Sequence, residues 1–276
     1  MWVPPTEREV MQSSNPVLGR AFNQRGYAAM DTTTTSDVSA DQLERTFNAP
    51  AASSMRTGRM TIDDVITRTG ILFAVLVAVG AVAWTSNLGG GALMLGVFGG
   101  FILAMVISFG KTVRPPLVIA YAALEGLALG VISHIYNEIY SGIVVQAVVA
   151  TLAAFTGVLF AYKSGRVRAT PKFQRALMGA AIGYLILGVA SLIGGAFFNL
   201  GNGAGLYGLS SVGPLLAIAG VAIASFFLVL DFDQIEKGIR AGAPEEQSWI
   251  AAFGLMVTIV WLYLEVLRLI SILRRD

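Results

Sequence analysis

Acidic side chains inside apolar stretches are the residues best suited to do chemistry in this chain. Asp231 directly follows an apolar run, and Glu265 lies within another, Trp249–Leu273. Glu125 lies near the middle of a third, Pro116–Tyr136. An ionisable group within a membrane span is costly to bury, so it faces the interior of a helix bundle or water. Asp231, Glu265 and Glu125 are therefore the candidate site residues.

Carboxyl groups in such positions favour proton and cation chemistry. Two of them held within about 4 Å of each other in a poorly solvated place cannot easily both ionise, so they share a proton. A pair of this kind holds two helices together until the shared proton is lost. Carboxylate oxygens also attract Ca²⁺, a hard cation that prefers oxygen ligands. The acids thus predict a pH-sensitive cation path, with Ca²⁺ as permeant ion and no bound cofactor.

Each acid also has a purely structural explanation. Arg268 follows Glu265 by three residues, on the same helix face, and an ion pair near the membrane interface would account for both. Glu125 would be explained by a protonated carboxyl bonded to a neighbouring helix. Asp233, which follows Asp231 closely, is expected in a solvated loop.

The sequence offers little support for an enzyme. Ser133 and His134 are adjacent, so their side chains cannot converge as a nucleophile and its base. One histidine and no cysteine are too few ligands for a zinc site. The Gly-x-Gly-Asp motif of intramembrane aspartyl proteases is missing from the sequence. We therefore expect a protein that is not an enzyme and that has no nucleic-acid partner.

Composition identifies the elements that must position these acids. Of the 276 residues, 55% are hydrophobic and 13% are charged, whereas about 25% are charged in soluble domains. About 20 apolar residues span a bilayer, and the sequence contains enough such runs for seven spans. We predict an all-α integral membrane protein, a seven-helix transmembrane domain over 61–276 preceded by a disordered cytoplasmic tail over 1–60. The predicted spans are Thr69–Ser86, Ala92–Phe109, Pro116–Tyr136, Ile143–Tyr162, Ala176–Phe198, Leu209–Leu230 and Trp249–Leu273.

Local patterns add two expectations about these helices. Thr61, followed by Asp63 and Asp64, is typical of a helix start, because a threonine caps and acids favour the first turn. Glycines four residues apart allow helix backbones to approach closely. Three such pairs occur: Gly96/Gly100, Gly126/Gly130 and Gly179/Gly183.

The distribution of basic residues predicts the orientation. Every second connection between the spans carries lysine or arginine, and the other three connections carry none. Basic residues in short loops stay in the cytoplasm, so the amino terminus is expected there, with the protein multi-pass in the plasma (inner) membrane. Seven spans then place Arg274 and Arg275 outside, which is a mild conflict with the same rule.

The motifs around the acids resemble those of the Bax inhibitor-1-like transmembrane family. The resemblance covers residues 65–276 and rests on three segments: Leu230–Ile235, reading LDFDQI, Leu262–Glu265, reading LYLE, and Glu125–Gly130, reading EGLALG. The polar tail resembles that of an actinobacterial-type bacterial branch. The resemblance implies a pH-sensitive Ca²⁺ leak with a central last helix, in which Asp231 and Glu265 are the paired acids and transient Ca²⁺ ligands.

This chain departs from the family pattern at the acids and at their cation. Glu265 stands where the family commonly has aspartate, which lengthens the pair by one methylene. The family's arginine near the cytoplasmic end of the second helix is missing here, so Lys111, Arg114 or, by its spacing, Arg268 is the candidate latch cation. To bring the acids together, we expect the sixth helix to continue to about Arg240, with Ile235–Gly254 as an elongated connection.

Two functions from other classes compete with the leak. A non-conducting membrane regulator would bind a membrane protease or a stress-response protein through the tail or the basic loops. A proton-coupled transporter would use Glu125 and would favour an inverted repeat, which the sequence does not clearly contain. Lipid, protons and Ca²⁺ are the partners expected of the leak.

Overall fold

The seven predicted spans form seven helices in the computed structural model, which describes residues 58–86, 88–110, 112–209 and 212–274. All of these residues belong to one unit, Ala52–Asp276. Each helix is long and apolar enough to cross a membrane, so this part of the chain is an all-α integral membrane domain. The tail predicted for 1–60 lies outside the described residues, apart from 58–60. The helices are α4 Ile62–Thr85, α5 Gly90–Phe109, α6 Pro115–Ile139, α7 Ile143–Lys163, α8 Pro171–Phe198, α9 Val212–Arg240 and α10 Gln247–Leu273, with a short 3₁₀ helix η1, Gly205–Gly208.

Local sequence sets where the helices begin. Thr61 caps α4 as predicted: its hydroxyl accepts from the Asp64 amide at 3.2 Å, and Asp64 accepts from the Thr61 amide at 2.9 Å. This reciprocal arrangement satisfies donors that the helix itself leaves unpaired. Pro115 begins α6 and Pro171 begins α8, where the missing amide proton costs no helical hydrogen bond.

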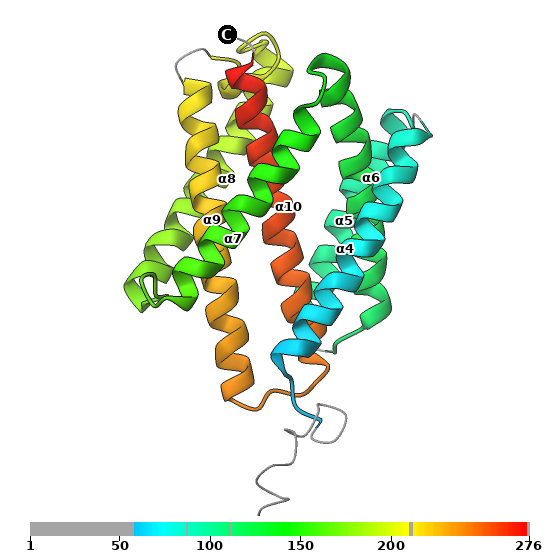
Figure 1. Ribbon diagram of the computed structural model, residues 1–276. Helices are drawn as coiled ribbons and strands as arrows, with labels where there is room; N and C mark the ends of the chain where they lie inside the picture. The colour runs from blue at the N-terminus through cyan, green and yellow to red at the C-terminus, as the bar shows by residue number, and fades with distance from the viewer. Residues whose placement is uncertain (1–57, 87, 111, 210–211, 275–276) are drawn as a thin grey trace, which may run out of the picture. The chain divides into compact units, whose positions relative to one another are not determined.

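The last helix is central, as the family resemblance implied. In Figure 1, α10 runs between a group formed by α4, α5 and α6 and a group formed by α7, α8 and α9. It packs against α9, α4, α7 and α6. By contrast, α5 packs mainly on α6, and α8 packs on α9 and η1. Side chains on one face of α10 therefore meet the first group, and those on the other face meet the second.

The helix that carries Asp231 is longer than its apolar run. As expected, α9 continues to Arg240. The elongated connection predicted for Ile235–Gly254 is wrong, because α10 begins at Gln247 and residues 241–246 alone join the two helices. Asp233, expected in a solvated loop, is a helical residue that is only 8% exposed. Its carboxylate pairs with Lys237 at 2.5 Å, one helical turn further along α9.

The start of α4 is fastened to this short connection. The Met60 amide donates to the Ala243 carbonyl at 2.8 Å, and the Glu245 amide donates to Gly58 at 2.9 Å. Arg68 of α4 pairs with the Glu245 carboxylate at 2.6 Å. The connection between α9 and α10 is thus held by backbone and side-chain contacts from the first helix.

The glycine pairs differ in what they do. A side chain on Gly126 would overlap the Leu76 carbonyl, and one on Gly130 would overlap the Gly80 carbonyl, so α4 and α6 touch through their backbones. In the α5 pair, Gly96 lies against α6 in the same way, whereas Gly100 makes ordinary contacts. The third pair, Gly179/Gly183, has open space where a Cβ would lie. The prediction that helix backbones approach closely at this pair is therefore wrong.

Candidate functional site

Asp231 lies in α9, nine residues before the helix ends, beside Thr258 of α10. Its Oδ2 atom is fully buried and has no hydrogen-bond partner among the described residues. The side chain is near the α9–α10 contact because α9 extends beyond its apolar run. A buried polar atom without a partner costs free energy, which sets Asp231 apart from the other acids that the structure describes.

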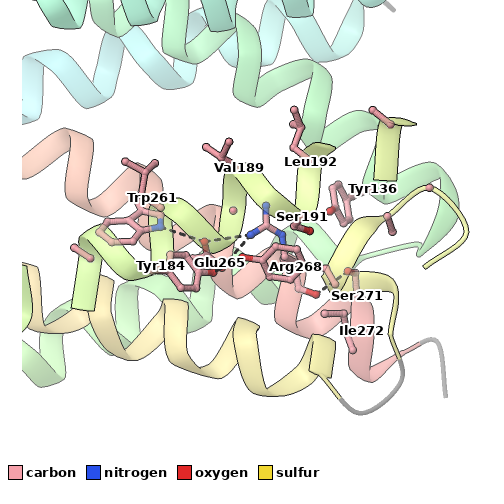
Figure 2. A pocket seen from close by; sticks show the side chains of 17 residues that line it. Tyr136, Tyr184, Val189, Ser191, Leu192, Trp261, Glu265, Arg268, Ser271 and Ile272 are labelled. Atoms are coloured by element: carbon pink, nitrogen blue, oxygen red, sulfur yellow. Dashed lines mark hydrogen bonds and ion pairs between the residues drawn. The ribbon is translucent and has the colours of Figure 1, made fainter. Parts of the chain in front are cut away.

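Glu265 lies on α10 with its carboxylate fully engaged. The Tyr184 hydroxyl donates to Oε2 at 2.7 Å, Trp261 Nε1 donates to Oε1 at 3.1 Å, and Arg268 Nη1 lies 3.2 Å from both oxygens. The residue is 3% exposed. The Tyr207 hydroxyl continues the network by donating to Tyr184 at 2.8 Å. Figure 2 shows Trp261, Glu265 and Arg268 along α10, with Tyr184 of α8 beside the carboxylate.

The structure does not bring Asp231 and Glu265 together. Oε2 of Glu265 would lie 2.5 Å from a Cβ on Gly220, and Gly220 precedes Asp231 by eleven residues of continuous helix, or about 16 Å. The short connection causes this separation, because it leaves Asp231 much closer to the end of the hairpin than Glu265 is. The expected carboxyl pair, and a Ca²⁺ site made from both acids, are therefore not formed in this arrangement.

Glu125 lies on α6 and is bonded within its own helix. The Tyr121 hydroxyl donates to its Oε1 at 2.5 Å, and the carboxyl lies near Gly100 of α5. Tyr121 also makes an edge contact with Phe253 of α10, with ring centres 4.9 Å apart. Glu125 is thus on the far side of α10 from Glu265, linked to α10 through Tyr121.

The three candidate latch cations have different places. Lys111 lies outside the described residues. Arg114 is the N-cap residue of α6 and lines a cavity of about 350 Å³ beside α5. Among the described residues it makes no ion pair with Asp231. Arg268 does pair with an acid, which is Glu265, as the simple structural explanation anticipated.

A cavity of about 980 Å³ lies beside the Glu265 network. Its walls come from α8, α10, the loop carrying η1 and Tyr136 of α6. Arg268 lies at this cavity with its guanidinium over the Tyr207 ring, 4.3 Å from the ring centre. The cavity is thus mostly apolar with a few polar groups gathered at one place, the usual form of a ligand pocket.

The aromatic partners of Glu265 were missed by the sequence analysis. Trp261 could have been found, because it precedes Glu265 by four residues and lies on the same helix face. Tyr184 and Tyr207 come from α8 and η1, which are far from α10 in sequence. No local sequence pattern marks these two tyrosines, because their contact with Glu265 depends on how α8 and η1 pack against α9.

The described residues contain no group of three or more histidine, cysteine, aspartate or glutamate side chains that could hold a metal ion.

Comparison with known proteins agrees with the motifs around these acids. No curated protein matches the chain. A family model described as Bax inhibitor 1 like matches residues 15–275, a range that includes all seven helices, both the α9 and the α10 acid, and much of the amino-terminal segment. A match of this extent covers nearly the whole chain, and we conclude that this protein belongs to the Bax inhibitor 1 like family.

Proposed function

We propose that this protein is a pH-sensitive cation leak rather than an enzyme, with Ca²⁺ as the permeant ion and Asp231 as the group that responds to pH. One observation carries the proposal: the buried, unpartnered Oδ2 of Asp231 within a membrane-spanning helix. An ionised carboxylate with a buried oxygen that accepts no hydrogen bond is costly in such a place. Binding or losing a proton or a cation there therefore changes the stability of the α9–α10 contact.

The two acids act in series in this proposal. Asp231 lies nearer the end at which residues 241–246 join α9 and α10, and Glu265 lies nearer the opposite end. Arg268 occupies the place of a cation on Glu265, so it serves as the latch. Transport requires Arg268 to leave Glu265 while the charge of Asp231 changes.

Ca²⁺ flux into vesicles that contain the purified full chain tests the proposal. We expect wild-type flux to differ between about pH 5 and about pH 8, the interval around neutrality over which the flux is measured. Asp231→Asn keeps the size of the side chain but cannot ionise, so its flux is expected to be independent of pH. Asp63→Asn, at an exposed acid in the first turn of α4, is the matched control and is expected to behave as wild type.

Two outcomes would contradict this function. If Asp231→Asn keeps the pH dependence of the wild-type protein, Asp231 is not the responding group. If none of the proteins conducts, the chain is a non-conducting regulator, and a pull-down with and without residues 1–60 becomes the next measurement.

A further inference from the structure

The cavity between α8 and α10 is lined by Glu265 and Arg268, but the proposed leak assigns no occupant to it. Its volume of about 980 Å³ is at the upper end of the range for small-molecule pockets, about 300–1,000 Å³. Gly188 and Leu192 line it from α8, and Trp261 and Arg268 line it from α10. In a membrane, a cavity of this size is expected to hold a ligand, lipid or water.

The α8 wall of the cavity is open to the membrane. Leu185, Val189 and Leu192 line the cavity and are nevertheless 66%, 52% and 72% exposed. These side chains lie within a helix that spans the membrane, so the solvent that reaches them is lipid. The α8 lining extends from Ala181 to Ala196, about 22 Å, which exceeds the roughly 15 Å depth of one leaflet's hydrocarbon. An acyl chain fits along this wall.

The Arg268 guanidinium brings hydrogen-bond donors without partners to this cavity. Arg268 uses Nη1 for Glu265, while its Nε and Nη2 have no hydrogen-bond partner within 58–86, 88–110, 112–209 and 212–274. Its side chain is 34% exposed. A guanidinium fork suits a phosphate group, to which it can donate two bonds. Arg268 precedes the last residue of α10 by five positions, about 8 Å, and a long arginine side chain near the end of a membrane span can extend toward the lipid headgroups.

The sign of the ligand's charge follows from the same network. Glu265 is the acid that lines the cavity in the described part of the chain, and its oxygens already accept from Tyr184, Trp261 and Arg268. The cavity therefore offers free donors and no free carboxylate for an amine or a metal cation. We propose that it binds one anionic phospholipid of the surrounding bilayer, with the phosphate on Arg268 and an acyl chain along α8.

Fluorescence of Trp261 tests this proposal directly, because the indole lines the cavity. The full chain with Trp2, Trp84 and Trp249 replaced by phenylalanine is reconstituted in phosphatidylcholine vesicles. A minor fraction of phosphatidylglycerol or phosphatidylcholine carries brominated acyl chains that quench a tryptophan in contact with them. We expect an apparent affinity for phosphatidylglycerol about tenfold higher than for phosphatidylcholine, as one charge-assisted hydrogen bond would give.

Two variants separate the headgroup contact from the acyl groove. Arg268→Gln is expected to reduce quenching by phosphatidylglycerol to the level of phosphatidylcholine, whereas Arg274→Gln, at a cation outside the cavity that binds Ser141, leaves it unchanged. Gly188→Phe fills the cavity without touching the charges, since a Cβ there meets nothing within 4 Å. Gly183→Phe is its control, on the same helix with equal space but outside the lining.

The proposal is overturned if both brominated lipids quench Trp261 equally in the single-tryptophan protein. It is also overturned if Gly188→Phe, folded by circular dichroism, is quenched as strongly as Gly183→Phe. The measurement involves no ion flux, so its outcome is independent of whether the protein conducts.

Discussion

At the scale of single residues, the two acids on α9 and α10 differ in how well they are satisfied. Glu265 accepts from three side chains, whereas Oδ2 of Asp231 has no partner among the described residues. A fully satisfied buried pair resists change, because separating it leaves two charges in a poor solvent. A carboxyl group with one unpaired oxygen can take up a proton or a cation that reaches it. Glu265 thus links α10 to Tyr184 of α8, whereas Asp231 is the acid that the proposed leak uses as its pH-responsive group.

Glu265→Gln is expected to destabilise the protein by about 3 kcal/mol, the lower end of the range for breaking a buried ion pair, because Arg268 is one-third exposed. The change removes one charge and leaves Arg268 without its counterion. Thermal unfolding in detergent measures the loss. Glu138→Gln, at a carboxylate that is 67% exposed, is the matched control and is expected to be close to neutral.

The double variant Glu265→Gln/Arg268→Met checks the cause of that loss. Removing both charges leaves no uncompensated ion, so much of the lost stability should return. A single variant as stable as wild type, or a double variant no better than the single one, would show that an uncompensated Arg268 charge is not the cause of the loss.

At the scale of elements, the helices differ in how closely they approach one another. The backbones of α4 and α6 touch at Gly126 and Gly130, whereas α8 leaves a cavity along α10. The sequence contains similar glycine pairs in both regions, so spacing alone does not predict close approach. Whether a glycine pair allows close approach depends on whether another helix packs against it. The glycines of α6 pack along α4, whereas Gly179 and Gly183 of α8 face open space.

Gly126→Ala is expected to lower the unfolding temperature, because its methyl group would overlap the Leu76 carbonyl and push α4 away from α6. Overpacking of this kind costs about 1–3 kcal/mol. Gly157→Ala on α7 is the control, since a Cβ there meets nothing within 4 Å. There, helix propensity favours alanine by up to about 1 kcal/mol. Equal unfolding temperatures for the two variants would show that α4 and α6 accommodate the extra methyl group without losing stability.

At the scale of the whole molecule, the sequence predicts the helices better than the site. Long apolar runs mark the spans because the bilayer allows few alternatives to a helix, and Thr61 marks the start of α4. Two features could not be predicted. The short connection between α9 and α10 is held by contacts with the start of α4, such as the Met60 amide to the Ala243 carbonyl at 2.8 Å, whereas α9 continues to Arg240 as expected. The Glu265 network depends on Tyr184 and Tyr207, which only the assembled bundle brings to α10.

The orientation of the bundle follows from charge and is open to a direct test. Lys163, Arg166 and Arg168 lie at or near one α7–α8 connection, while the connection at 140–142 carries no basic residue. We expect the basic end in the cytoplasm. The chain has no cysteine, so Ser141→Cys and Ser164→Cys, both at exposed loop positions, each give one thiol. An impermeant maleimide applied to intact cells should label Ser141→Cys, and should label Ser164→Cys only after the membrane is opened. The reverse pattern would place the amino terminus outside and would put Arg268 in the opposite leaflet.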